Sequence, residues 1–589
     1  MAKTYEETEE EYLKTEKNSK AFLRLIREIF RDRGTTAKVV ISVIITALAG
    51  TFYPLALGLS IDGILSRNEF YFVFFALIFL FLFFVVFLSN RLRTVQTTKL
   101  AQQKVKDLRD RAFLSLQEAH INFFSKVKTG YLISRITNDA ENLSEFLTFQ
   151  LPQVVSGIVT VVFSVVIMSI LNFSLTLYAL LIIPVLLLFT FSLQGRVMRN
   201  YLATRKTIAA ITGSMSETIN AFRAIKAYSA EESFEASFSK LNKNNFSANM
   251  KAAKLSSLFG SVVRIIEAFG IVFVIYEGAR ELTAGLISIG ILVSFILYVQ
   301  EFFDPVTQLS QLYTSYQSAM VGVSRIYSII DVEGEALDGN KGNQPSFRDS
   351  IEFKNVSFSY GSALALKNVN IKISRGDRIG IVGHTGAGKT TFSNLLLGFY
   401  SPSEGEILLD GQNLKKYDPA SYRHIIAPVL QDMFLFRGTV IENISFSNPL
   451  LTRDEIISMA REFGLIEIFE GLPYGFDTDV GELGSNLSDG QKQAVSLMRA
   501  FVRRPEILLM DEPTSQVDPF TESIIIEALK RYVADRTLVL ITHRFSMISL
   551  VDRIIVIDHG NVIQEGSFES LNVKGTEFYN LYQTYSGIE

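Results

Sequence analysis

The sequence predicts a multi-pass α-helical membrane domain followed by a soluble α/β domain. Three observations support this fold class. Almost half of the 589 residues are apolar (48%) and 47 are Phe, whereas only 20% are charged. Six long apolar stretches lie before residue 306. From about residue 349, short β-branched runs alternate with Gly-rich turns and helical segments, which is typical of an α/β domain.

The composition excludes several kinds of chemistry. The 57 basic and 60 acidic residues give a net charge of -3, which argues against a nucleic-acid partner. Without Cys the chain has no disulfide, thiolate metal site or Cys nucleophile, and five His residues leave little room for a His-rich metal site. The acidic, polar N-terminus resembles neither a secretory signal nor a transit peptide, so we expect it in the cytoplasm.

We expect residues 1–36 to hold an amphipathic helix and residues 37–330 to form the membrane domain of six helices. Residues 18–33 place apolar side chains such as Leu25 and Ile29 among basic ones, which predicts a helix in the membrane interface. A bilayer core needs about 20 apolar residues per helix, and six stretches meet this length. They are 39–61, 70–90, 151–171, 174–193, 256–280 and 287–305.

The connections between these stretches predict their orientation. The connection from 91 to 150 carries ten Lys or Arg residues, and the one between the fourth and fifth stretches is similarly long. The opposite connections are short and hold one Arg between them. The positive-inside rule therefore places the long connections in the cytoplasm, where their spacing predicts helices projecting beyond the membrane. We expect the plasma (inner) membrane as the location.

Three ionisable residues fall at membrane depth. A rise of about 1.5 Å per residue places Arg264 about 24 Å and Glu301 about 22 Å from the outer surface. Glu267 lies one turn from Arg264. Such residues form an internal ion pair or a cavity wall, which we favour, or they contact a substrate or proton directly.

The α/β domain, predicted at 349–589 after a linker at 331–348, contains a phosphate-binding loop of the P-loop NTPase kind. An apolar strand at 378–382 leads into the sequence GHTGAGKT and then a helix. The glycines let backbone N–H groups turn toward phosphates, and the helix N-terminus favours their charge. Lys389 reaches the β and γ phosphates, and Thr390 is a predicted Mg²⁺ ligand. The nucleotide-binding residues predicted here are Gly383, His384, Thr385, Gly386, Ala387, Gly388, Lys389, Thr390 and Thr391.

Two later strands end in groups suited to phosphoryl transfer. The apolar run before Asp511 and Glu512 is a strand whose end places Asp511 as a Mg²⁺ ligand and Glu512 as the catalytic group that polarises water. His543 follows a second apolar run, and we predict that it contacts the γ-phosphate as a second catalytic residue. A solvated acidic turn and a structural His are the alternatives.

The sequence LSDGQ at 487–491 closely resembles the LSGGQ signature of ATP-binding-cassette (ABC) proteins. On this resemblance the whole chain is similar to one half of an ABC exporter, with six spans before the cassette. The resemblance implies that Tyr360 stacks on adenine and that Gln431 joins the Mg²⁺ shell.

The same resemblance implies a mechanism with two chains. Two cassettes meet head to tail, so that Ser488, Gly490 and Gln491 bind the nucleotide of the partner chain. Closure on two ATP molecules turns the membrane cavity outward, and hydrolysis resets it. Short coupling helices near 121–125 and 224–228 carry the motion.

One residue departs from the family pattern. Asp489 replaces the first signature glycine, so its charge and bulk should weaken closure on the ATP that it faces. Glu512 and His543 are nevertheless intact. In heterodimeric exporters of this family, the half with the altered signature typically keeps the catalytic Glu. We therefore expect a heterodimer with one degenerate ATP site; a homodimer that tolerates Asp489 is the alternative.

The resemblance implies ATP-driven export or flipping of an apolar or amphipathic substrate. ATP and Mg²⁺ are the expected cofactors, and a second ABC half, membrane lipid and a small amphipathic substrate are the expected partners. A homodimeric lipid flippase, and an ATP-gated regulator or importer on the same scaffold, are the alternatives. A soluble ABC ATPase that acts on DNA or ribosomes conflicts with the six apolar stretches.

Overall fold

The computed structural model describes residues 18–67, 69–335, 345–361, 363–431, 433–513 and 517–586. The chain divides into two compact units. The membrane unit comprises residues up to Gln117 and Val127–Val332, and the α/β unit comprises Glu118–Lys126 and Glu333–Glu589. The predicted N-terminal segment up to residue 17 and residues 336–344 of the predicted linker lie outside the described residues.

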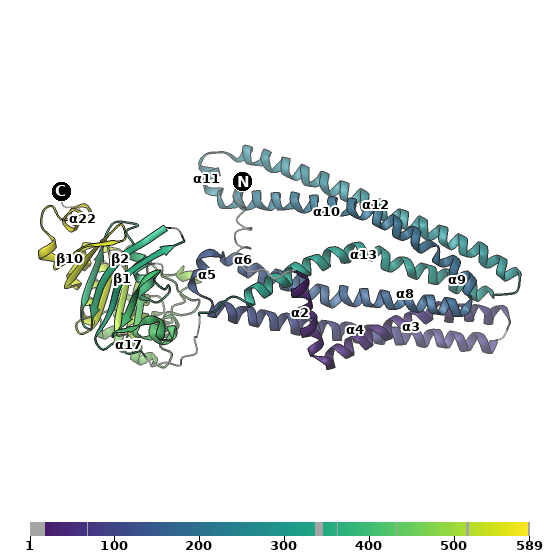
Figure 1. The fold of residues 1–589 in the computed structure, drawn as a ribbon, viewed down its shortest axis with the longest axis horizontal. Coiled ribbons are helices and arrows are strands. Elements are labelled where there is room, and N and C mark those ends of the chain that lie inside the picture. The colour runs from purple at the N-terminus through teal and green to yellow at the C-terminus, as the bar shows by residue number, and fades with distance from the viewer. Residues whose placement is uncertain are drawn as a thin grey trace. The chain divides into compact units, whose positions relative to one another are not determined.

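The membrane unit consists of helices, several of which are longer than a bilayer is thick (Figure 1). α4 has 50 residues and α12 has 53, so at about 1.5 Å per residue each extends well beyond a hydrocarbon core of about 30 Å. The elements are α2 (Asn18–Arg31), α3 (Arg33–Leu65), α4 (Glu69–Glu118), α6 (Thr129–Ser134), the π-helical η1 (Arg135–Asp139), α7 (Ala140–Glu145), the π-helical η2 (Phe146–Gln150), α8 (Leu151–Leu171), α9 (Phe173–Leu180), α10 (Ile182–Asn220), α11 (Phe222–Ala227), α12 (Glu231–Thr283) and α13 (Ile289–Ile330).

Each predicted apolar stretch falls in helical structure. Within the described residues, 5 helical segments are long and apolar enough to cross a membrane, and the sixth stretch coincides with a shorter apolar part of α13, Ile289–Phe303. The fourth stretch differs from the prediction, because α9 ends at Leu180 and α10 begins at Ile182. Pro184 explains this break, since its ring clashes with the carbonyl four residues earlier and it has no N–H to donate.

α2 forms where the amphipathic helix was predicted, but part of its apolar surface packs on protein. Ala21, Leu25 and Ile29 are at most 6% exposed and lie in a cluster with residues of α4, α7 and α13. Leu23 and Phe30 are exposed. The apolar surface is therefore divided between the helix bundle and the surroundings, and the position of α2 in the interface stays a prediction.

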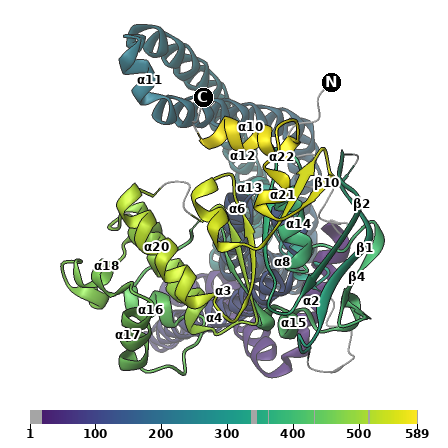
Figure 2. The ribbon, with the colours of Figure 1, turned by 90° about the vertical axis from the view of Figure 1, so that its left-hand side faces the viewer.

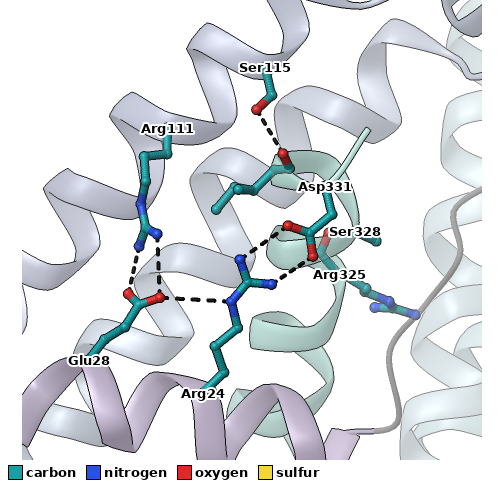
Figure 3. Close-up of polar contacts among 8 residues, drawn as sticks. Arg24, Glu28, Arg111, Ser115, Arg325, Ser328 and Asp331 are labelled. Atoms are coloured by element: carbon teal, nitrogen blue, oxygen red, sulfur yellow. Dashed lines mark hydrogen bonds and ion pairs between the residues drawn. The ribbon is translucent and has the colours of Figure 1, made fainter. Parts of the chain in front are cut away.

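A polar cluster joins α2 to α4 and to the end of α13 (Figure 3). Arg24 donates two hydrogen bonds to Asp331, at 2.7 and 3.1 Å. Glu28 accepts from Arg111 at 2.7 Å, and the Ser115 hydroxyl donates to a backbone carbonyl of α13 at 2.9 Å. Three segments that are distant in the sequence are thus held together at one end of the membrane unit.

The ionisable residues at membrane depth have different surroundings. Glu301 on α13 accepts a hydrogen bond of 2.9 Å from the Ser164 hydroxyl on α8. Arg264 is exposed and Glu267 is half-buried. No ion pair joins Arg264 to Glu267 in the described part of the chain, so the choice between an ion pair with another group, a cavity wall and a substrate contact stays a prediction.

The α/β unit contains two sheets. Five strands of the larger sheet are parallel and the edge strand β10 is antiparallel, in the order β10-β9-β3-β8-β7-β6. The smaller, antiparallel sheet has the order β2-β1-β4-β5. In Figure 2, α17, α18 and α20 lie to one side of this unit and β1, β2 and β4 to the other. Its strands are β1 (Ser350–Tyr360), β2 (Ala363–Ser374), β3 (Arg378–Val382), β4 (Glu404–Leu409), β5 (Gln412–Asn413), β6 (Ile426–Val429), β7 (Ile507–Asp511), β8 (Thr537–Ile541), β9 (Arg553–Asp558) and β10 (Asn561–Gly566).

The helices of the α/β unit pack on an apolar core between and around the sheets. Phe353 of β1 stacks on Phe392 of α14, with ring centroids 4.7 Å apart, and this contact fixes α14 against both sheets. The helices are α5 (Ile121–Lys126), α14 (Lys389–Leu396), η3 (Leu414–Lys416), α15 (Pro419–Ile425), α16 (Val440–Ser445), α17 (Arg453–Glu462), α18 (Ile466–Glu470), η4 (Gly475–Asp477), η5 (Glu482–Gly484), α19 (Asp489–Val502), α20 (Pro519–Tyr532), η6 (Phe545–Leu550), α21 (Phe568–Leu571) and α22 (Glu577–Ser586).

Two short helices occupy the positions predicted for coupling helices. α11 lies between the long helices α10 and α12 of the membrane unit (Figure 1). α5 belongs to the α/β unit, where the neighbouring Ala119 forms a β-bridge with Gly334. Their role in carrying motion stays a prediction.

Candidate nucleotide-binding site

A tight loop between β3 and α14 forms the first part of the site. The strand is buried and leads through residues 383–388 to Lys389, the first residue of α14. Gly388 has φ +109°, and a Cβ there would lie 2.8 Å from the carbonyl oxygen of Ala365. A Cβ on Gly383 would collide with a backbone carbonyl of β9. Glycine is therefore required at both positions, and the loop backbone can approach a ligand closely.

Lys389 is held inside this loop. Its side chain is buried, and its ammonium donates to the carbonyl oxygens of Gly383 at 2.8 Å and His384 at 3.0 Å. Burial lowers the pKa of Lys389, against the opposing effect of Glu512 and Asp511 nearby. Phosphate oxygens are stronger acceptors than carbonyl oxygens because they are charged, so the ammonium is placed to exchange these bonds for phosphate contacts. Of the other loop residues, His384, Thr385, Gly386 and Thr390 are exposed, whereas Ala387 and Thr391 are buried.

Asp511 ends β7 next to this loop. It pairs in register with Ile541, the last residue of β8, so both strands end at the same edge of the sheet. The carboxylate is 7% exposed and accepts a hydrogen bond of 3.3 Å from the Ser393 hydroxyl on α14. Burial raises the pKa of Asp511, Ser393 and Lys389 act in the opposite direction, and Glu512 adds to the increase. A nearby cation would therefore favour the ionised carboxylate.

Glu512 and His543 meet at the same edge. Glu512 has φ +50°, an uncommon conformation for a non-glycine residue, and its N–H donates to Ile541 at 2.9 Å. The side chain of Glu512 is 18% exposed, and its Oε1 lies 3.1 Å from Nδ1 of His543. The two predicted catalytic side chains are thus in direct contact, beside the predicted metal ligand Asp511.

The other residues predicted to bind this nucleotide lie around the loop. Tyr360 ends β1, is 44% exposed, and packs edge-on against Tyr400 with ring centroids 5.4 Å apart. Asn394 of α14 donates to its hydroxyl at 3.3 Å. Gln431 is exposed two residues after the end of β6.

The predicted signature residues form a separate group at the start of α19. Ser488 caps this helix: its hydroxyl accepts from the N–H of Gln491 at 3.3 Å, and the Gln491 side chain accepts from the N–H of Ser488 at 2.9 Å. Gly490 is buried, and a Cβ there would lie 2.7 Å from Thr521 of α20. Within the described residues, no hydrogen bond or ion pair joins this group to the phosphate-binding loop. One chain therefore does not bring the two parts together.

The structure adds two contacts that sequence reasoning missed. Ser393 lies one helical turn after Lys389, so helical spacing alone could have placed it near the strand ends. His384 lies 3.4 Å from Glu577 of α22, and no local pattern indicates that contact because the residues are 193 positions apart.

The donor set suits Mg²⁺ bound together with phosphates. A buried carboxylate on Asp511 and the exposed Thr390 offer oxygen atoms, which Mg²⁺ prefers. Among the described residues there is no group of three or more His, Cys, Asp or Glu side chains that could hold a metal alone. Phosphate oxygens and water are therefore needed to complete the coordination, as is usual for Mg²⁺ at nucleotide sites.

Two family models match the chain. Residues 37–306 match the family model of the ABC transporter transmembrane region, and residues 366–515 match the family model named ABC transporter. The curated relatives include an uncharacterised ABC transporter ATP-binding protein of Bacillus subtilis, YfiC, which is 34% identical over 96% of this chain and 95% of its own length.

Two further relatives carry functional names. An ATP-dependent lipid A-core flippase of Syntrophus aciditrophicus is 32% identical over 82% of this chain and 81% of its own length. A putative multidrug export ATP-binding/permease protein of Staphylococcus aureus is 32% identical over 81% of this chain and 83% of its own length. Among solved structures, a bacterial Atm1-family ABC exporter with ATP bound matches with a TM-score of 0.79 and 25% identity, over 94% of this chain and 99% of that one.

Proposed function

Because the chain belongs to the ABC transporter family and has the exporter order of a membrane domain before the cassette, we propose that it exports an apolar or amphipathic substrate as half of a heterodimer. ABC exporter halves work as dimers and use ATP hydrolysis to drive transport. What is proposed here is the choice of a different partner chain, the asymmetry of the two ATP sites and the class of substrate.

The observation that carries the heterodimer is Asp489 in a chain with a complete catalytic group. Asp511, Glu512, His543 and Lys389 lie at one edge of the sheet, as an active ATP site requires. The carboxylate of Asp489 instead belongs to the signature, which faces the other ATP of the dimer. One consensus site thus uses this chain's catalytic group, and one degenerate site uses its altered signature.

At the consensus site, Glu512 orients and deprotonates the attacking water. The contact with His543 restricts the rotation of the Glu512 side chain, and the uncommon backbone conformation at Glu512 directs it away from the strand. Lys389 binds the transferred phosphate, and Tyr360 packs against the adenine. Asp511, Thr390 and Gln431 would hold Mg²⁺, which would supply positive charge to neutralise the phosphates.

The composition of the spans supports the proposed class of substrate, although such residues also face lipid. The exposed surface of the membrane unit is rich in Phe, Leu, Ile and Val. A substrate that moves between such helices is apolar or amphipathic, and relatives named for lipid flipping and for multidrug export fit this class. We place the protein in the plasma membrane with the α/β unit in the cytoplasm, because the basic connections lie on that side.

Transport by inside-out vesicles tests the proposal. Vesicles that contain the complex are expected to accumulate a fluorescent amphipathic dye or a labelled lipid against its gradient. This accumulation should occur only when ATP and Mg²⁺ are present. Matched vesicles that contain the Glu512→Gln complex should not accumulate it. ATP-gated flux that stops at equal concentrations on both sides would indicate a channel and overturn the exporter.

A further inference from the structure

The first turn of α19 contains an ion pair that the family resemblance does not imply. Asp489 begins the helix, and its Oδ1 lies 3.1 Å from the ammonium of Lys492. The two residues are three positions apart, so their side chains project from the same face of the helix. The Asp489 side chain is 47% exposed and that of Lys492 is 22% exposed.

A glycine positions Lys492. Gly484 ends η5 with φ +78°, and a Cβ there would lie 3.1 Å from Cε and 3.4 Å from Cδ of Lys492. The missing side chain leaves room for the aliphatic part of the Lys492 side chain. The stem of Lys492 therefore passes over Gly484, and its ammonium lies within ion-pair distance of the Asp489 carboxylate.

The ion pair changes the charge that α19 presents. An isolated Asp489 would add one negative charge to the end of the helix, next to the nucleotide that the signature faces. The partially positive helix N-terminus offsets part of that charge, and the ammonium of Lys492 offsets a further part. Crowding by the Asp489 side chain remains, but the electrostatic repulsion expected from the sequence is reduced.

We propose that Lys492 is a positioning residue that neutralises Asp489, so that the degenerate site holds ATP despite the loss of the signature glycine. This inference rests on the proposed function, because it assumes that the signature faces a nucleotide.

Trapped ATP measures this role directly. The full-length complex with Glu512→Gln is loaded with radiolabelled ATP and Mg²⁺, passed through a desalting column, and assayed for bound ATP per complex and for its release rate. Lys492→Ala should lower the bound ATP from two to about one per complex and speed release from the weakened site about tenfold, which corresponds to about 1.4 kcal/mol. Lys492→Arg should restore both values, because it keeps the charge.

A double-mutant cycle separates the pair from other effects. In the Asp489→Gly background, Lys492→Ala should change release less than twofold, because no carboxylate remains to neutralise. Lys530→Ala, which removes an exposed charge at the far end of α20, is the matched control and should change nothing.

The possible failures are distinguishable. Two outcomes would overturn the role of Lys492 and leave the proposed function standing. In the first, Lys492→Ala has the same effect on ATP release in both backgrounds. In the second, Lys492→Ala has no effect in the native background although Asp489→Gly slows release. If neither Asp489→Gly nor Lys492→Ala changes ATP retention, the signature does not face a nucleotide and both proposals fail. Loss of both bound ATP molecules with Lys492→Ala would support Lys492 but contradict the heterodimer, since both sites would then contain this signature.

Discussion

At the end of β7, two neighbouring carboxylates acquire different properties from their surroundings. Asp511 is buried against Ser393, whereas Glu512 turns out of the strand with φ +50° and contacts His543. The backbone conformation, rather than the residue type, separates the two. One carboxylate is thus suited to a metal ion and the other to a water molecule.

Replacing Glu512 with Gln should lower ATP turnover about 10²–10⁴-fold, because a general base contributes a factor of that size. ATP binding should be retained, since the phosphate-binding loop is unchanged. Steady-state phosphate release and nucleotide binding by the purified complex measure the two effects. The assigned role is wrong if more than about a tenth of the rate remains.

Replacing Asp511 with Asn should stabilise the nucleotide-free protein while abolishing Mg²⁺-dependent hydrolysis. Burial raises the pKa of Asp511 in the folded state. Its contribution to stability is therefore fully present below the unfolded pKa, about 3.9, and is lost as pH rises through the folded pKa. At pH 7 the Asn variant should show the higher Tm in calorimetry without metal, and the difference should shrink on acidification. A lower Tm at pH 7 would contradict this explanation.

At the scale of elements, α3 and α13 approach each other through small residues. A Cβ on Gly58 of α3 would collide with the Ser294 hydroxyl and the Gly290 carbonyl, and a Cβ on Gly290 would collide with Gly58. Ser294 also donates to the Pro54 carbonyl at 2.9 Å. The two helices therefore pack with their backbones in contact, as small residues allow in membranes.

Gly58→Ala should destabilise the membrane unit by about 1–3 kcal/mol, because the added methyl group forces the two helices apart. Gly50→Ala is the matched control in the same helix, since a Cβ there meets nothing within 4 Å. It should be neutral or stabilising by up to about 1 kcal/mol, because Ala favours helix more than Gly does. Thermal unfolding followed by circular dichroism in detergent compares them, and equal Tm values would refute the close packing.

The polar cluster that joins α2 to α4 and α13 provides a test that depends on pH. Burial acts to raise the pKa of Glu28, but the hydrogen bond and charge of Arg111 outweigh it and leave the pKa below its usual range. The contribution of Glu28 to stability is then present above the unfolded pKa, about 4.3, and is lost as pH falls through the lower folded pKa. Protection of α2 from hydrogen exchange should therefore stay constant from pH 7 to pH 5, after correction for intrinsic rates.

Glu28→Gln should weaken the attachment of α2 by about 1 kcal/mol, because the partly exposed pair of Glu28 and Arg111 loses one of its charges. Hydrogen exchange of the α2 amides at pH 7 should then be about fivefold faster. Asp110→Asn on α4 is the control, since its carboxylate makes only a 4.0 Å ion pair with Lys106. Equal exchange in both variants would show that apolar packing alone holds α2.

At the scale of the whole molecule, the absence of Cys means that introduced cysteines can test which chain pairs with which in the dimer. No hydrogen bond or ion pair joins the signature to the phosphate-binding loop within the described part of one chain, and the proposed function has the two meet across a dimer. Thr385 and Ser488 are both exposed, at the two surfaces that the proposal brings together.

A chain that carries both Thr385→Cys and Ser488→Cys should not form a covalent homodimer when it is oxidised in the native complex with ATP bound. Its partner lacks the matching residue in a heterodimer, whereas a homodimer would form two disulfides. Non-reducing gel electrophoresis measures the yield. A cross-linked homodimer as the main product would overturn the heterodimer and leave the exporter assignment intact.

Local sequence patterns were enough to predict the two-part architecture, the apolar stretches, the phosphate-binding loop and the carboxylates at the strand end. These features depend on local composition and short spacing, which hydropathy and glycine or proline geometry encode directly. The break before α10 was also encoded locally, in Pro184, although the predicted span at 174–193 overlooked it. Long-range packing leaves no such local pattern.

Only the tertiary structure decided which distant groups meet. Arg24 contacts Asp331 across 307 positions, and Ser393 reaches Asp511 across 118. The stem of Lys492 lies against Gly484 because a turn with positive φ brings that glycine under α19. Asp489 taken alone predicted repulsion between its carboxylate and the nucleotide phosphates. Its contact with Lys492 in the folded chain instead indicates an ion pair of zero net charge. The physical reason is that charge depends on neighbours in space, and the folded chain sets those neighbours.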